Sequence, residues 1–172
     1  MNWTRRQWGS IVLLIGCISA IPIFFVDWYR YPYVRDATVG QVQLGTYPVK
    51  LIDILLHTIR IPPGATSPVF GPTIFWQIGL YFGGILFFVV TAIIALRTKA
   101  PLRGLFILSC VYIVIIGGLT GFEQLGAGLT ALSAPYVGIQ LTSYHLLLLV
   151  YSGCIFVGSY LISLARKNDA TT

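Results

Sequence analysis

The chain has 172 residues, which is enough for one domain, and 56% of them are hydrophobic while only 9% are charged. Soluble domains carry about 25% charged residues, so this composition excludes an ordinary water-soluble fold. The formal net charge of +6 does not indicate a nucleic-acid partner, because the basic residues are dispersed around apolar runs instead of clustered on one solvated face. We therefore expect a single membrane domain over residues 1–172, in contact with the lipid bilayer.

Four apolar runs predict membrane-spanning helices, at residues 10–26, 74–96, 104–121 and 141–164. Each run approaches the roughly 20 residues that a helix needs to cross the hydrocarbon core. The predicted fold class is an all-α, multi-pass integral membrane protein, a four-helix bundle with a long outer segment at residues 28–72. The sequence GAGLTALSAPYVG, residues 126–138, predicts a loop with at most one helical turn between the third and fourth helices.

The first apolar run allows two interpretations, a retained membrane anchor or a cleaved secretory signal peptide. Arg5 and Arg6 precede its hydrophobic core, as they would in either case. The core is followed by DWYRYPY, whose bulky aromatic residues replace the small residues of a cleavage site, and this favours an anchor. Both interpretations place the next segment on the outer side of the membrane.

The distribution of basic residues predicts the orientation of the spans. Seven Lys and Arg residues flank the predicted inner ends of the spans, against four on the outer side. The inner set is Arg5, Arg6, Arg97, Lys99, Arg103, Arg166 and Lys167, and the outer set is Arg30, Arg35, Lys50 and Arg60. Because basic residues are retained on the cytoplasmic side, we expect a plasma-membrane protein with both termini in the cytoplasm. The Trp and Tyr residues around the first run are interpreted as an interfacial belt.

The outer segment contains two predicted elements. The rough alternation in TVGQVQLGTY, residues 38–47, is compatible with a short β-hairpin. In PVKLIDILLHTIRIPP, residues 48–63, the polar residues Lys50, Asp53, His57 and Arg60 recur at the spacing of one helix face. This pattern predicts a short amphipathic helix on the outer membrane surface, beginning near Pro48 and ending before Pro62.

The few ionisable residues on the outer side form one candidate polar site, composed of Asp53, His57, Glu123 and His145. His145 lies just inside the fourth predicted span, and ionisable groups in a membrane are functional hypotheses by default. A bond between Glu123 and His145 that merely closes the helical hairpin is the alternative interpretation. The sequence contains no catalytic motif, indicates no cofactor, and predicts no metal site, because no set of ligands stands at a suitable spacing.

Small residues predict where helices approach one another closely. Gly79 and Gly83 form a GxxxG pair in the second predicted span, and Gly117 and Gly121 form another in the third. These glycines could seal the bundle internally or dock a partner. The favoured function is a non-catalytic subunit that packs with other membrane subunits into a larger respiratory or transport complex. The alternative is a small redox, quinone or proton-handling protein that uses the outer site around Glu123 and His145.

Overall fold

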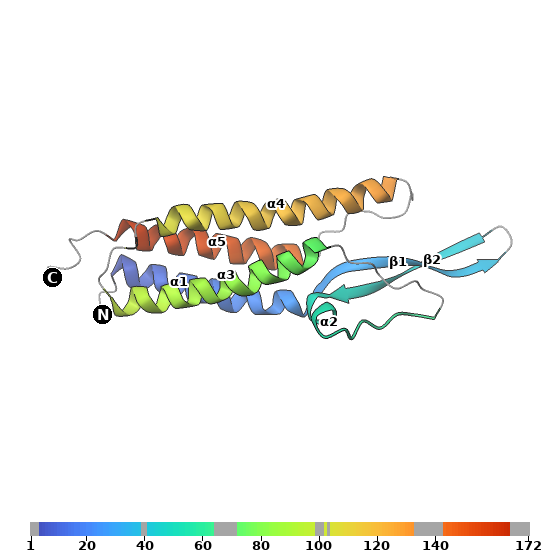
Figure 1. The fold of residues 1–172 in the computed structure, drawn as a ribbon, viewed down its shortest axis with the longest axis horizontal. Coiled ribbons are helices and arrows are strands. Elements are labelled where there is room, and N and C mark those ends of the chain that lie inside the picture. The colour runs from blue at the N-terminus through green and yellow to red at the C-terminus, as the bar shows by residue number, and fades with distance from the viewer. Residues whose placement is uncertain are drawn as a thin grey trace.

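The computed structural model describes residues 4–38, 41–63, 72–98, 102, 104–132 and 143–165. Four long helices run side by side, and a two-stranded β-hairpin extends beyond one end of this bundle (Figure 1). The elements in chain order are α1 (Arg5–Ala20), the 3-10 helix η1 (Ile21–Phe24), β1 (Asp27–Thr38), β2 (Gln41–Lys50), α2 (Leu51–Leu55), α3 (Pro72–Arg97), α4 (Leu105–Leu132) and α5 (Ser143–Leu164). The start of α1 and the end of α5 lie together at the end opposite the hairpin.

Within the described residues, three helices are long and apolar enough to cross a membrane. They are Arg5–Phe24, Phe75–Arg97 and Tyr144–Leu164. The described apolar part of α4, Leu105–Gly121, is shorter than these. Many large apolar side chains on all four long helices are exposed, as expected when lipid replaces water as the solvent. The fold is therefore mostly helical and indicates a membrane protein, as the hydropathy pattern predicted.

The first span begins earlier and ends differently than the sequence predicted. Thr4 caps the start of α1 in a reciprocal capping box, in which its hydroxyl accepts from the Gln7 backbone and its own backbone donates to the Gln7 side chain. The regular helix ends at Ala20, and Pro22 lies in the 3-10 turn that follows. Proline suits this first turn because its missing N–H has no helical acceptor there.

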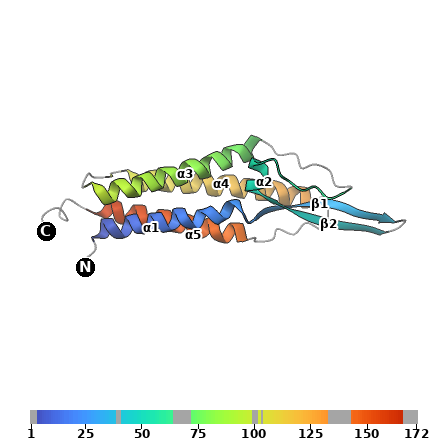
Figure 2. The same ribbon diagram turned by 90° about the horizontal axis from the view of Figure 1, so that it is seen from below.

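The four long helices pack as a ring in which α1 contacts α3 and α5, and α4 contacts the same two helices from the other side (Figure 2). The closest approach in this ring is between α1 and α5. A methyl group added at Gly9 would lie 2.7 Å from the Gly158 carbonyl oxygen, and one added at Gly158 would lie 2.8 Å from the Gly9 carbonyl oxygen. Glycine at both positions is therefore what lets the two backbones meet.

The β-hairpin is longer than expected and corrects the all-α prediction. The segment DWYRYPYVRDAT, interpreted above as an interfacial aromatic belt, forms β1 and pairs antiparallel with β2. Pro32 pairs with Thr46 and Pro48 pairs with Arg30. Because proline has no N–H to donate across a ladder, both prolines occupy positions whose N–H would point to an outer edge. Each edge of the hairpin therefore lacks one backbone N–H donor, and this disfavours the pairing of a further strand.

The predicted amphipathic helix is largely absent, since only Leu51–Leu55 is helical. Lys50 belongs to the end of β2, and the chain reverses direction after Leu55. Thr58 donates its backbone N–H to the Asp53 carbonyl at 2.9 Å, and His57 donates to Ile54 at 3.3 Å. This is a Schellman motif with His57 in the left-handed region at φ 51°. Leu51 and Ile54 are buried and fix this turn against the end of the bundle.

The third predicted span is also corrected, because α4 continues eleven residues past its predicted end at Gly121. The sequence GAGLTAL, residues 126–132, is helical although its glycines predicted a loop. Leucine and alanine are strong helix formers, and their preference outweighs the cost of about 1 kcal/mol for each glycine. The rest of the predicted loop, residues 133–138, lies outside the described residues.

Candidate functional site

Asp53 and His57, the first half of the predicted outer site, flank the end of α2 at the hairpin end of the bundle. Asp53 accepts a hydrogen bond of 3.3 Å from the Thr58 hydroxyl. His57 is exposed and has the backbone conformation of a helix C-cap. Both residues therefore have structural roles in the turn, and no described contact pairs the imidazole with the carboxylate.

His145 and Glu123 are the second half of that predicted site. His145 lies on the first turn of α5, half-buried, with its ring edge-on to Tyr144 at a centroid distance of 5.3 Å. Glu123 lies in α4, and its side chain is outside the described residues. The described contacts thus do not bring the four predicted residues together. No group of three or more potential metal ligands occurs in the part of the chain that the structure describes.

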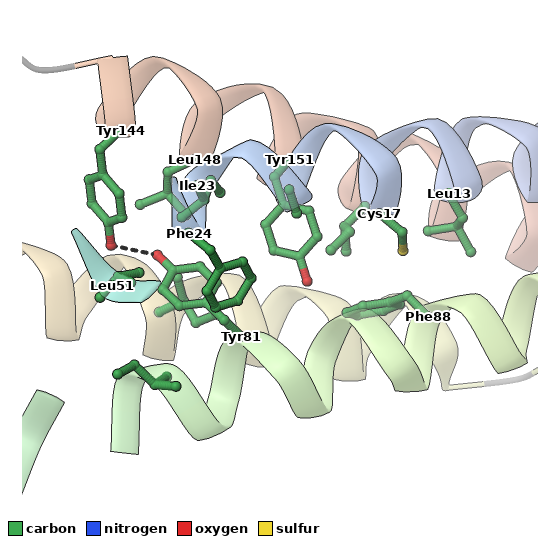
Figure 3. Packing of buried hydrophobic residues seen from close by; sticks show 14 of the residues in the cluster. Leu13, Cys17, Ile23, Phe24, Leu51, Tyr81, Phe88, Tyr144, Leu148 and Tyr151 are labelled. Atoms are coloured by element: carbon green, nitrogen blue, oxygen red, sulfur yellow. Dashed lines mark hydrogen bonds between the residues drawn. The ribbon is translucent and has the colours of Figure 1, made fainter. Parts of the chain in front are cut away.

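The structure instead places a series of neutral polar groups inside the bundle. At its hairpin end, the hydroxyls of Tyr81 on α3 and Tyr144 on α5 form a hydrogen bond of 2.8 Å across the centre of the ring (Figure 3). Both side chains are 1% exposed. Trp28, just after the start of β1, packs edge-on against Tyr144 at a centroid distance of 6.4 Å. The hairpin base therefore covers this tyrosine pair.

A second tyrosine pair lies deeper in the bundle. The hydroxyls of Tyr112 on α4 and Tyr151 on α5 are 2.9 Å apart. Tyr112 also donates to the Leu80 carbonyl of α3 at 3.2 Å, and Gly84 leaves the space that its ring needs. One hydroxyl thus connects three helices. In Figure 3 the Tyr151 side chain points toward α3, and it lies farther from Tyr144 along the bundle than Tyr81 and Phe24 do.

Gln77 on α3 and Thr120 on α4 form the outermost polar contact between these two helices. The Gln77 amide nitrogen donates to the Thr120 hydroxyl at 3.5 Å, and that hydroxyl donates to the Ile116 carbonyl at 2.9 Å. Gln77 is 1% exposed, and its side-chain oxygen has no hydrogen-bond partner among the described residues. Because amide groups buried in apolar surroundings are nearly always paired, this oxygen is an exception among the described residues of the bundle.

Polar contacts continue toward the opposite end. Ser109 on α4 and Ser159 on α5 are both fully buried, with their hydroxyl oxygens 2.6 Å apart. At the end of the bundle, Arg6 on α1 donates from Nε to the Ala95 carbonyl at 2.8 Å. This carbonyl is one of the last four of α3, which have no partner within their own helix. The bundle therefore contains hydrogen-bonding groups from one end to the other.

Among the residues that the structure describes, the glycines predicted to pack helices together contact no other helix of this chain. A methyl group added at Gly79, Gly83, Gly117 or Gly121 would meet nothing within 4 Å. Close approaches within the chain occur elsewhere, at Gly9, Gly16, Gly84 and Gly158. Within the described residues no contact supports internal sealing by the two predicted pairs, and docking of a partner stays a prediction.

The sequence carries one signal for the buried polar groups. Gln77, Tyr81 and Thr91 recur at i, i+4 and i+14, so they lie on one helix face. Ser109, Tyr112 and Thr120 recur at i, i+3 and i+11 and share a face in the same way. Polar residues confined to one face of an apolar helix indicate the interior of a bundle. Such neutral groups can donate and accept hydrogen bonds.

Comparison of the chain with protein-family models, curated proteins and solved structures found no match, so its function is argued from its own residues.

Proposed function

We propose that this chain is a non-catalytic subunit that packs, through the outward-facing glycines of α3 and α4, into a larger membrane complex of the respiratory or transport kind. The observation that carries the proposal is the orientation of Gly79 and Gly83 on α3 and of Gly117 and Gly121 on α4. All four are exposed, and added methyl groups would meet open space. In a bilayer, where apolar burial no longer drives association, helices meet most closely along such small residues.

The proposal includes a four-span topology, in which the apolar part of α4 crosses the membrane beside the three longer spans. Arg5, Arg6 and Arg97 lie at the end of the bundle opposite the hairpin. The positive-inside rule assigns this end to the cytoplasm and the hairpin to the outer side of the plasma membrane. The hairpin would then be available to the outer domain of a partner subunit, while the exposed glycines of α3 and α4 pack against the partner's membrane-spanning helices.

The experiment is extraction of the tagged full chain from its native membrane in a mild detergent, followed by identification of stoichiometric partners. In a second sample, Gly79→Leu and Gly83→Leu fill the glycine face of α3. We expect the partner to be lost while the chain accumulates and unfolds as the unmodified protein does, since a methyl group added at either position meets no described atom within 4 Å.

Gly153→Leu is the matched control. Gly153 is also an exposed helical glycine with open space around it, but it lies on α5. We expect this variant to retain the partner. A monodisperse single chain that releases no stoichiometric partner under any mild extraction would contradict the proposed function.

A further inference from the structure

The formal charges of the chain are divided unevenly between the two ends of the bundle. On the hairpin side, four basic and four acidic residues cancel: Arg30, Arg35, Lys50 and Arg60 against Asp27, Asp36, Asp53 and Glu123. The seven basic residues of the opposite end are opposed only by Asp169, so 7 − 1 at this end accounts for the whole net charge of +6. Three of the seven, Arg5, Arg6 and Arg97, lie in the described part of the chain. This end of the bundle therefore attracts anions.

The three described arginines differ in how their charge is compensated. Arg6 donates from Nε to the Ala95 carbonyl at 2.8 Å, and Arg97 lies in the last turn of α3. Both cations thus lie at the C-terminal end of a helix, where the carbonyl groups favour positive charge. Arg5 lies in the first turn of α1, which contains no acidic residue, and its side chain is exposed. Of the three, Arg5 is therefore the cation that the chain itself compensates least.

The outward face of α1 continues from Arg5 with apolar side chains. Trp8 and Ile15 follow at i+3 and i+10, so the three residues lie within about a quarter of the helix circumference. Trp8 is 54% exposed and Ile15 is 53% exposed, whereas Leu13 and Cys17 on the other side of α1 are buried. Trp8 lies about 4.5 Å deeper than Arg5, and Ile15 about 15 Å deeper. The face thus presents a cation, an amphipathic ring and an aliphatic side chain in order of depth.

We propose that this face of α1 binds one anionic phospholipid, with its phosphate at Arg5, its glycerol backbone against Trp8 and an acyl chain along Ile15. The order of the three groups matches the order of the three side chains, since tryptophan settles at the headgroup level. Phosphatidylcholine fits less well because its choline cation is repelled by the same end of the bundle. The surface is separate from the glycines of α3 and α4, so the proposal does not depend on the subunit role or on the orientation in the membrane.

The test measures which lipid lies beside Trp8. In the purified full chain, Trp3→Phe, Trp28→Phe and Trp76→Phe leave Trp8 as the single tryptophan. The protein is placed in phosphatidylcholine nanodiscs that contain either dibrominated phosphatidylglycerol or dibrominated phosphatidylcholine, whose bromine atoms quench tryptophan fluorescence on contact. We expect phosphatidylglycerol to be preferred about fivefold, which corresponds to the roughly 1 kcal/mol that one basic residue contributes near a membrane surface. Arg5→Gln should abolish this preference and Arg5→Lys should retain it.

Two controls separate a site on α1 from a general attraction to the basic end. Arg97→Gln removes the same charge from the same end but from α3, and should leave the preference at Trp8 within about twofold of its original value. A chain whose single tryptophan is Trp76, 73% exposed near the hairpin end of α3, should show no preference. Equal quenching of Trp8 by the two lipids would overturn the proposal, and this measurement needs no substitution at Arg5. Equal losses in Arg5→Gln and Arg97→Gln would overturn it as well, because the attraction would then be a property of the whole end.

Discussion

Tyr151 donates its hydroxyl hydrogen to Tyr112, because the single hydroxyl hydrogen of Tyr112 is already directed to the Leu80 carbonyl. The 2.9 Å bond between the two tyrosines joins α4 to α5, and the 3.2 Å bond to Leu80 joins α4 to α3. Tyr112 is thus acceptor and donor at once, whereas Tyr151 is only a donor in this set. The two residues therefore differ in what their removal leaves behind.

This difference predicts unequal effects of removing each hydroxyl. Tyr112→Phe leaves the buried Tyr151 hydroxyl without an acceptor and should lower the free energy of unfolding by about 1–2 kcal/mol. Tyr151→Phe removes one donor and should cost about 0.6 kcal/mol, the average for interhelical bonds in membranes. Denaturant unfolding in bicelles measures both values, and the double variant gives the coupling energy. A larger loss for Tyr151→Phe than for Tyr112→Phe would contradict the assigned bond directions.

The glycines predict a second contrast, between positions that contact a helix and positions that do not. Gly9→Ala would place a methyl group 2.7 Å from the Gly158 carbonyl oxygen, so α1 and α5 must separate. We expect a loss of about 1–3 kcal/mol in unfolding free energy, as for other overpacked interiors. Gly79→Ala meets open space and should be neutral or stabilising by up to about 1 kcal/mol, because alanine favours helix. Melting temperatures of the two variants in the same detergent measure this contrast. Equal destabilisation by both would contradict the close packing of α1 against α5 at Gly9.

Hydropathy predicted three spans that the structure confirms, since the bilayer imposes a length and a composition on each of them. Hydropathy could not predict β1, because aromatic residues such as those in DWYRYPYVRDAT are common both in interfacial segments and in β-strands. The amphipathic pattern at residues 48–63 was equally ambiguous. Its helix ends at Leu55 because His57 takes a left-handed conformation. The burial of Leu51 and Ile54 helps to fix this turn. The sequence has no glycine at position 57 that would have predicted it.

The site was predicted less well than the fold. The predicted outer site was built on ionisable residues such as Asp53 and His57, whereas the polar groups buried in the bundle are neutral side chains such as Tyr81 and Gln77. Their partners come from other helices, so the pairs depend on which helix faces meet. Similarly, GxxxG spacing marks glycines able to pack without telling whether the neighbour belongs to the same chain. GxxxG spacing therefore predicts Gly79 as a packing position but does not predict the contact between Gly9 and Gly158.

His57 predicts a stability effect that separates a structural role from a chemical one. A residue at φ 51° is strained unless it is glycine, so His57→Gly should raise the free energy of unfolding by up to about 1 kcal/mol. His57→Val places a β-branched residue in the same conformation and should lower it by about 1–2 kcal/mol. Thermal unfolding of the purified variants provides the measurement. If His57→Gly were the less stable of the two, the cap geometry assigned to this turn would be wrong.

The proposed orientation predicts which ends of the bundle react with a membrane-impermeant thiol reagent. In a background where Cys17, Cys110 and Cys154 are replaced by serine, Thr58→Cys adds one thiol at the hairpin end and Thr98→Cys adds one at the other. Both threonines are exposed, so accessibility depends on the side of the membrane. We expect a charged maleimide to label the Thr58→Cys protein in intact cells and the Thr98→Cys protein only after permeabilisation, because the proposed orientation places the end with Arg5, Arg6 and Arg97 in the cytoplasm. The opposite pattern would invert the topology and move the hairpin inside. Labelling of both variants in intact cells would mean that α1 and α3 do not separate the two ends across a bilayer.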